Sequence, residues 1–303
     1  MMLAWLRIGL RMISIVLPSG ISTSKLGFGT ARLHHMGSSK DRQRLLAAAF
    51  DLGLHHFDTA PSYGHGLAER ELQTFLRPRR NSFTVATKYG IPAAGWIARA
   101  PLSAVRPALV LQKVASKVGL AREVWPELTP EGLRRTVEDS LRRLKVDVID
   151  IHFLHEANLQ RATRPQELAE TYRSLIKQGL IRAFGIAGDF AGCAELKRQA
   201  GWEDAIVQTD EAQWSAELVP DITYRVIVSG PQQHGPSGLT DAEAIDRLYA
   251  AHLRRPNGML LVSSTKVEHV ASLAQGLAAR LTPRFGEGPD TAGQTDLPAS
   301  QRP

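Results

Sequence analysis

Short apolar runs rich in β-branched and aromatic residues alternate along this chain with longer amphipathic segments. Short runs of this kind predict buried strands, and apolar residues at helical spacing predict helices that pack through one face. The expected strands are Leu26–Thr30, Leu54–Asp58, Phe83–Lys88, Val148–Leu154, Ile181–Ile186, Ala205–Thr209, Tyr224–Val228 and Met259–Ser263. The expected helices are Asp41–Leu52, Leu67–Leu76, Pro130–Leu144, Gln166–Gln178, Ala191–Ala200, Asp241–Leu253 and Val267–Leu281.

The ends of several helices carry the expected capping residues. Thr129 supplies an N-cap before Pro130, and Gly179 follows the helix that ends at Gln178. Strands that alternate with helices favour parallel βαβ units. No Gly-x-Gly-x-x-Gly fingerprint is present, so we predict an α/β fold of the (β/α)8 TIM-barrel type and not an open Rossmann sheet.

The segment 89–128 after the third strand is far longer than an ordinary βα loop. A helical pattern runs from Ser103 to Ala121 within it. Long loops at the carboxyl end of a barrel shape substrate pockets, although a surface ornament is the alternative. The bulky and charged side chains of this loop are Trp96, Arg99, Arg106 and Trp125.

The two ends of the chain differ from the central repeat. Pro18-Ser19-Gly20 is a turn signal between two short β-rich runs, which predicts a β-hairpin before the barrel. We therefore expect one barrel domain over residues 12–281, preceded by an arm at 1–11. The last segment, 282–303, is rich in Pro, Gly, Thr and Asp without periodicity, and we expect it to be disordered.

Composition narrows the classes of partner. The net charge is +7 over 303 residues, but the basic residues are scattered and form no aromatic-interleaved stripe, so nucleic acid is not an expected partner. The apolar start of the chain is too short and too charged to span a bilayer, and Cys193 is the single cysteine. We expect a cytoplasmic protein without a membrane segment, a disulfide framework or a metal site.

Four chemically active side chains stand at or just past the ends of predicted strands. Asp58 ends the second strand, Tyr63 follows it in a Pro-Ser-Tyr-Gly turn, Lys88 ends the third and His155 ends the fourth. Because carboxyl ends of barrel strands meet at one face, these residues are expected to share a site. Singly, they also fit a turn-forming Asp, a loop Tyr, a solvated Lys and a structural His.

Other histidines compete with His155 for a role in that site, namely His55, His56 and His152. Side chains alternate between the two faces of a strand. His152 lies three residues before His155, so the two should point in opposite directions. The pattern therefore favours His155.

The segments "FDTAPSYG", "TKYG" and "VDVIDIHFLHE" resemble the signature segments of the aldo-keto reductases, (β/α)8 barrels that interconvert carbonyls and alcohols with a nicotinamide cofactor. The resemblance extends over residues 12–281 and favours the branch that acts on aldoses, including sugar 1-dehydrogenases. It implies that Tyr63 is the acid-base residue and that Lys88 lowers the pKa of its phenol. Asp58 would keep Lys88 charged, and His155 would orient the substrate carbonyl.

The same resemblance points to cofactor contacts later in the chain. Gln208 matches the glutamine that meets the nicotinamide amide, and Ser263, Ser264 and Lys266 resemble the segment that receives the adenosine 2′-phosphate. Hydroxyls, a lysine and a helix N-terminus all favour an anion, although an ordinary N-cap with a surface lysine is the alternative. Lys266 favours NADP over NAD.

Some family features are missing from this sequence. Gly-x-Ser-Asn after the fifth strand is replaced by Gly185-Ile186-Ala187-Gly188, and in the segment "VIVSGPQQHG" the resemblance places Ser229 where the family has a nicotinamide-stacking aromatic. Leu273 stands nearest to an expected asparagine, while Trp202 and Trp214 are aromatic substitutes or, more simply, core residues.

Two functions therefore follow from the sequence. The first is an NADP-dependent oxidoreductase acting on an aldehyde, aldose or ketone, and the alternative is a non-catalytic nucleotide-binding or regulatory barrel. A small-molecule carbonyl or sugar is the expected partner, and a monomer or weak homo-oligomer the expected state.

Overall fold

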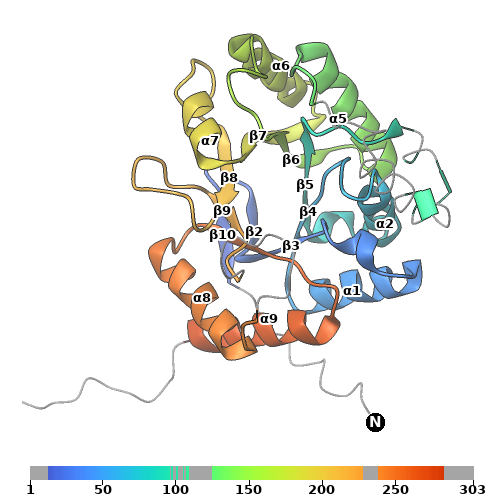
Figure 1. Ribbon diagram of the computed structural model, residues 1–303, viewed down its shortest axis with the longest axis vertical. Helices are drawn as coiled ribbons and strands as arrows, with labels where there is room; N and C mark the ends of the chain where they lie inside the picture. The colour runs from blue at the N-terminus through green and yellow to red at the C-terminus, as the bar shows by residue number, and fades with distance from the viewer. Residues whose placement is uncertain are drawn as a thin grey trace, which may run out of the picture.

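Eight parallel strands close into a barrel in the computed structural model, which describes residues 13–95, 97, 100–101, 105, 107–108, 125–227 and 238–282 (Figure 1). The strands follow one another around the barrel in chain order, and β10 closes the ring by pairing with β3. The barrel strands are β3 (Leu26–Gly29), β4 (His56–Asp58), β5 (Thr84–Tyr89), β6 (Ile149–His155), β7 (Ile181–Gly188), β8 (Ile206–Asp210), β9 (Ile222–Tyr224) and β10 (Met259–Val262). The predicted fold class is confirmed.

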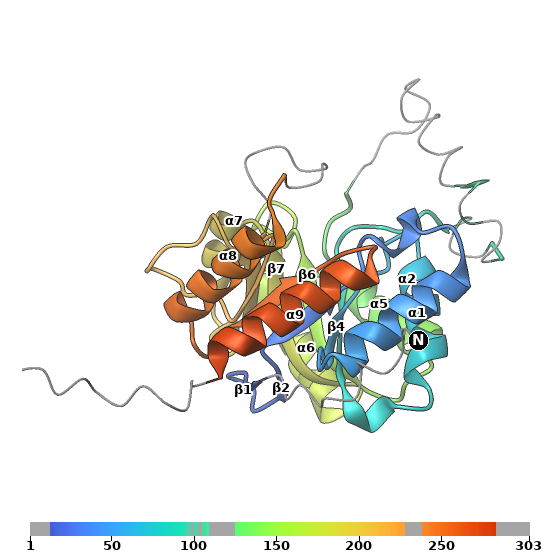
Figure 2. The ribbon, with the colours of Figure 1, turned by 90° about the horizontal axis from the view of Figure 1, so that it is seen from below.

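An antiparallel hairpin precedes the barrel, as the turn signal predicted. It consists of β1 (Ser14–Val16) and β2 (Ser22–Ser24), and Gly20 takes a positive φ of 76° at the turn. Its apolar side chains pack into one cluster with residues from inside the barrel (Ile15, Leu17 and Ile21 from the hairpin; Ile151, Ile206, Ile222 and Met259 from the strands). The hairpin therefore closes one end of the barrel (Figure 2).

Helices pack around the outside of the barrel and bury their apolar faces against the strands. Side-chain caps fix several N-termini, and Thr129 accepts from the Gly132 backbone N–H at 3.1 Å, as predicted. The described helices that follow barrel strands are α1 (Ser39–Asp51), α2 (Leu67–Leu76), α5 (Pro130–Leu144), α6 (Pro165–Lys177), α7 (Phe190–Lys197), α8 (Asp241–Arg254) and α9 (Val267–Leu281).

The predicted seventh strand, Tyr224–Val228, is wrong. The strand is Ile222–Tyr224, and it begins directly after Pro220 and Asp221. Asp221 is not a loop residue here, because its carboxylate accepts from the Val207 backbone N–H and its own N–H bonds to the Val207 carbonyl. Residues 211–221, all of them described, form turns without a helix, so the β8 unit of the barrel departs from the βα pattern.

Several predictions fall on parts of the chain outside the described residues. These are the arm at 1–11, most of the tail at 282–303, most of the helical stretch Ser103–Ala121, the side chains of Trp96, Arg99 and Arg106, and Ser229. Ile97 and Val105 of the long loop are described, and both are fully buried in the main core. At least part of this loop therefore packs against the barrel and its helices.

The described residues contain neither a membrane-spanning helix nor a cluster of metal ligands. No helix among them is both long and apolar enough to cross a membrane. Nor do His, Cys, Asp or Glu side chains in those parts of the chain gather in threes that would hold a metal ion.

His152 and His56 are completely buried, and each leaves its Nε2 atom without a hydrogen-bond partner. Burial lowers the pKa of His152 to about 3 and that of His56 to about 4. In the unfolded chain the pKa of a histidine is about 6.5. Below that pH the unfolded chain therefore binds more protons than the native protein, and the free energy of unfolding falls as the pH drops. At pH 5 each histidine costs roughly 2 kcal/mol relative to neutral pH.

We expect His152→Asn to weaken this acid sensitivity, because asparagine keeps a polar atom near Tyr172 but binds no proton. Urea unfolding at pH 7 and pH 5 measures the effect. His269→Asn is the control, since His269 is only half-buried and lies 3.8 Å from Asp241 near the surface of α9. If wild type and His152→Asn lose the same free energy of unfolding between pH 7 and pH 5, buried His152 is not a source of the acid sensitivity.

Candidate active site

Three neighbouring strands bring the predicted catalytic residues together. Asp58, Lys88 and His155 stand at the carboxyl ends of β4, β5 and β6, which pair in parallel register. Tyr63 follows β4 in a turn. All four line one cavity of about 360 Å³, together with Gln208 from β8 and further residues from the surrounding strand ends (Gly29, Ala31, Arg32, Glu156, Ala187, Gly188, Tyr224, Arg225, Ile227, Leu261, Val262 and Ser263).

A buried ion pair lies at the base of this cavity. Lys88 Nζ donates to both carboxylate oxygens of Asp58, at 2.6 and 2.7 Å, and to the Thr59 carbonyl at 2.9 Å. Gln208 Nε2 donates to Asp58 Oδ1 at 2.9 Å. Burial lowers the pKa of Lys88, and the charge of Asp58 opposes that effect. Each of the three ammonium protons therefore has a hydrogen-bond acceptor, which fixes the position of the pair.

Tyr63 lies over this pair with its ring toward His155. Lys88 Nζ is 5.0 Å from the ring centroid, and the Tyr63 and His155 rings meet edge to face with centroids 6.1 Å apart. Burial, the charge of Asp58, Tyr224 and the charge of Glu156 raise the pKa of Tyr63 well above its usual value. These effects oppose the lowering of this pKa that was expected from Lys88, whose ammonium is paired with Asp58 at 2.6 Å.

His155 points into the cavity, whereas His152 points to the helical layer, as the strand alternation predicted. His152 Nδ1 is 3.1 Å from the hydroxyl of Tyr172 in α6. Burial, Lys88 and Arg161 lower the pKa of His155 well below its usual value, so its imidazole is neutral. A neutral imidazole can donate one hydrogen bond to a substrate oxygen without carrying charge.

The predicted cofactor residues divide into two groups. Gln208 Oε1 and Ser263 Oγ are buried, line the cavity and have no hydrogen-bond partner among the described residues, so both can bind an amide or hydroxyl group of a ligand. Ser264 instead forms a local turn with Lys266, accepting from its N–H at 3.1 Å. Lys266 is exposed at the N-cap of α9, beyond the cavity lining.

An aromatic side chain that the sequence analysis did not assign to the site stands at the end of β9. Tyr224 lines the cavity, and its hydroxyl donates to the Gly188 carbonyl at 3.2 Å. The error followed from the misplaced seventh strand, which put the strand end beyond Tyr224. The earlier suggestion that Ser229 replaces the aromatic depended on the same misplacement. Trp202 and Trp214, the other aromatic candidates, lie outside the cavity lining, beside Tyr172 and Arg255 respectively.

Arg161 is a second residue that sequence reasoning did not identify. Its guanidinium donates to the carbonyls of Glu156 at 2.6 Å, Gly90 at 2.5 Å and His155 at 3.3 Å, and it also reaches the Pro126 carbonyl. It therefore ties the segments after β5 and β6 to the end of the long loop. Gly90 permits this approach, because a Cβ at its φ of +148° would stand 2.2 Å from the His155 carbonyl oxygen.

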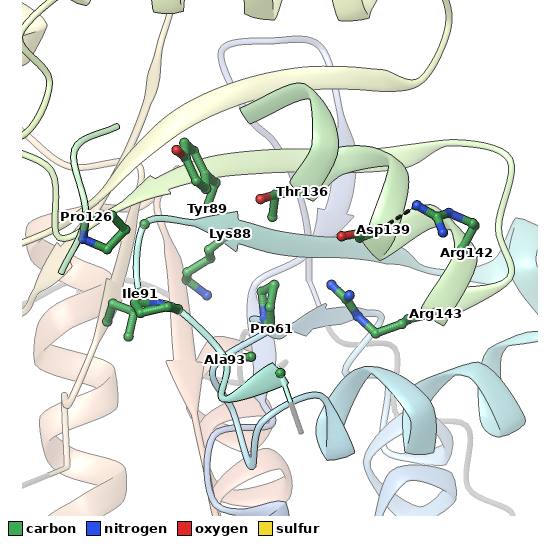
Figure 3. Close-up of a pocket in the computed structure, with 13 residues that line it drawn as sticks. Pro61, Lys88, Tyr89, Ile91, Ala93, Pro126, Thr136, Asp139, Arg142 and Arg143 are labelled. Carbon is green, nitrogen blue, oxygen red and sulfur yellow. Dashed lines mark hydrogen bonds and ion pairs between the residues drawn. The ribbon is translucent and has the colours of Figure 1, made fainter. Parts of the chain in front are cut away.

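A second cavity of about 570 Å³ lies on the other side of Lys88, between α5 and the segment after β5 (Figure 3). Its lining includes Pro61, Ile91 and the paired side chains of Asp139 and Arg142. Neither Tyr63 nor His155 lines it. The candidate chemistry therefore belongs to the smaller cavity, where these two residues meet.

The closed parallel barrel with polar groups at the carboxyl ends of its strands is the arrangement of TIM-barrel enzymes. Residues 25–210 match the sequence profile of the aldo/keto reductase family. The chain belongs to this family.

Among known proteins, the chain is 32% identical over 176 residues to D-threo-aldose 1-dehydrogenase of Pseudomonas sp., which is 55% of this chain and 51% of that protein. It is 30% identical over 168 residues to pyridoxal 4-dehydrogenase of Microbacterium luteolum, covering 54% and 48%. The chain thus spans about half the length of the curated relatives it matches.

Solved structures show the same fold over a longer stretch. A Pseudomonas aeruginosa protein described as an aldo-keto reductase has a TM-score of 0.66 at 21% identity, covering 91% of this chain and 99% of its own. An aldo-keto reductase of Klebsiella pneumoniae in complex with NADPH has a TM-score of 0.61 at 21% identity, covering 88% and 90%.

Proposed function

We propose that this protein is an NADP-dependent reductase or dehydrogenase that interconverts a small carbonyl compound, an aldehyde, aldose or ketone, with its alcohol. The observation that carries the proposal is the convergence of Tyr63, Lys88, Asp58 and His155 on one cavity. The relative named D-threo-aldose 1-dehydrogenase and the NADPH complex of the Klebsiella structure support the substrate class and the cofactor.

The free polar atoms of the cavity fit a nicotinamide. Gln208 Oε1 is an unpaired buried acceptor suited to a carboxamide NH₂, and Ser263 Oγ offers a hydroxyl beside it on the cavity wall. Tyr224 offers an aromatic surface. Ser264 and Lys266, at the start of α9, are proposed to meet the phosphate-bearing end of the cofactor.

The bound cofactor supplies or accepts a hydride at the substrate carbon. In the direction of reduction, neutral His155 donates a hydrogen bond to the carbonyl oxygen and fixes its position. Tyr63 then transfers its phenolic proton to that oxygen as negative charge develops there. The Lys88–Asp58 pair keeps Tyr63 in place and stabilises the resulting phenolate. In the direction of oxidation the same groups act in reverse, with Tyr63 as the base.

A non-catalytic nucleotide-binding barrel is the second candidate. The observation that favours it is the absence of side-chain donors at Ala187 and Gly188, where the resemblance calls for serine and asparagine. The intact set of four residues at the cavity base argues against it.

Titration of the purified protein with NADPH and NADH, followed by nucleotide fluorescence, tests the proposal. We expect NADPH to bind at micromolar concentration and more tightly than NADH, and Gln208→Ala to weaken binding about tenfold, because one buried hydrogen-bonding group is lost. Gln213→Ala, in the turn after β8, is the control. Absence of binding by both nucleotides would overturn the enzyme assignment. NADPH binding without turnover of aldehydes or sugars would favour the second candidate.

A further inference from the structure

Glu156 places a carboxylate on the wall of the active-site cavity, directly after His155. It takes a φ of 50°, which few residues other than glycine adopt. Its backbone is fixed on both sides, since its N–H donates to the Ala187 carbonyl at 2.7 Å and its carbonyl accepts from Arg161 at 2.6 Å. The unusual conformation is therefore maintained by specific contacts, and it sets the direction of the side chain.

The carboxylate lies against the bare backbone of β7. A Cβ on Gly188 would stand 3.1 Å from Glu156 Oε2 and 3.0 Å from its Cα, and Gly188 itself has a φ of +156°. The missing side chain at Gly188 thus leaves the room that Glu156 occupies. The serine and asparagine donors expected at Ala187 and Gly188 are absent, and the Glu156 carboxylate lies beside this position.

Among the described residues no cation lies within ion-pair distance of the Glu156 carboxylate, although its charge is felt by Tyr63, Tyr224 and Lys88 across the cavity. Two other charges that line the cavity are paired within the chain: Asp58 with Lys88, and Arg225 with Asp210 at 2.9 Å. Glu156 is half-buried, and its carboxylate is partly desolvated. Burial and the charge of Asp189 raise the pKa of this carboxyl, whereas a hydrogen bond from the Asp189 backbone and the charges of Arg161 and Lys88 oppose the rise. A carboxylate has about four acceptor sites, so one bond from the backbone leaves acceptors for a ligand.

An ionised carboxylate only accepts hydrogen bonds, and it accepts hydroxyl donors strongly. It repels a carboxylate or phosphate brought into the same low-dielectric cavity. Because Glu156 follows His155, it lies next to the residue proposed to bind the reacting carbonyl. It can therefore meet substituents on the carbon atoms beside that carbonyl.

On the basis of the proposed function, we infer that Glu156 is a specificity residue that selects neutral, hydroxyl-bearing carbonyl substrates such as aldoses by accepting a hydrogen bond from a hydroxyl near the reacting carbon. It also excludes anionic aldehydes. Arg32, on the segment after β3, lines the same cavity and is available to the anionic cofactor, whereas Arg225 is paired with Asp210.

Three substrates of similar size test this inference: glyceraldehyde, propanal and glyoxylate. In wild type we expect kcat/KM to rank in that order. Glu156→Gln, which keeps the shape but removes the charge, is expected to lower kcat/KM for glyceraldehyde about tenfold, mainly through KM. The value for propanal should stay within about twofold and that for glyoxylate should rise several-fold, since a repulsion is removed. Glu170→Gln, exposed on α6, is the matched control.

Equal changes for glyceraldehyde and propanal would overturn the inference, because a general disturbance of the site acts on both. A weaker affinity of Glu156→Gln for NADPH with an unchanged KM for glyceraldehyde would also overturn it and assign the carboxylate to the cofactor. If wild type turns over none of the three substrates, the proposed function fails by itself. Ligand-observed NMR of sorbitol with wild type and Glu156→Gln then decides: loss of sorbitol binding in the variant supports the inference, and equal binding overturns it.

Discussion

Tyr63→Phe is expected to lower turnover by about 10²- to 10⁴-fold, the range that general acid-base catalysis contributes. The substitution removes one hydroxyl and keeps the ring that packs edge to face on His155. NADPH affinity and thermal stability should therefore stay close to wild type. Steady-state kinetics with the best aldehyde or sugar substrate, together with nucleotide titration, measures both. Tyr249→Phe, on α8, is the control for loss of a phenol elsewhere.

The direction of the Tyr63 pKa shift gives this prediction a pH dependence. Burial and the surrounding carboxylates raise this pKa above 10, so the phenol remains protonated over the whole neutral and mildly basic range. Reduction, which consumes that proton, should lose no activity between pH 7 and pH 9 through Tyr63. Oxidation needs the deprotonated form and should accelerate as the pH rises. A reductive rate that falls with an apparent pKa below 9 in wild type, and not in a Tyr63→Phe background, would contradict this assignment.

The fold was predictable because each barrel strand is an apolar run followed by a turn or capping signal, and most predicted boundaries lie within a few residues of the observed ones. The failure at β9 had a local cause. The strand begins at Ile222, two residues before the predicted start, directly after Asp221, which bonds to both backbone groups of Val207. Side-chain bonding of this kind between distant segments has no signature in a single sequence.

Within the candidate site, residues at strand ends were predictable and residues that act through loop geometry were not. Asp58 and His155 end their strands, Lys88 is the last residue but one of β5, and Gln208 lies two residues before the end of β8. Arg161 donates to the backbone carbonyls of His155, Glu156 and Gly90. The spacing of residues in the sequence does not predict such contacts. For Glu156 a signal existed: an acidic residue directly after the strand-ending histidine, paired with small residues at the end of the next strand. Its meaning depended on knowing that β6 and β7 are neighbours.

Variants of the Lys88–Asp58 pair are expected to affect stability and turnover in different ways. Lys88→Met leaves Asp58 buried without its ammonium partner, with the Gln208 amide as its remaining side-chain donor. Breaking a buried pair from one side costs about 3–5 kcal/mol. Asp58→Asn should have a comparable cost, because it leaves the buried ammonium uncompensated. Both variants should also lose turnover by about 10³-fold or more, since the group beneath Tyr63 is lost or misplaced.

The double variant Asp58→Asn/Lys88→Met carries no unpaired buried charge. We therefore expect its loss of stability to be smaller than the sum of the two single losses, by a coupling free energy of about 2–3 kcal/mol in a double-mutant cycle measured by urea unfolding. Turnover should not recover, because the ammonium that stabilises the Tyr63 phenolate is still missing. Additive losses of stability would show that the two charges do not stabilise each other in the native protein. Recovery of turnover in the double variant would show that the pair serves the fold alone, and that the chemistry resides in Tyr63 and His155.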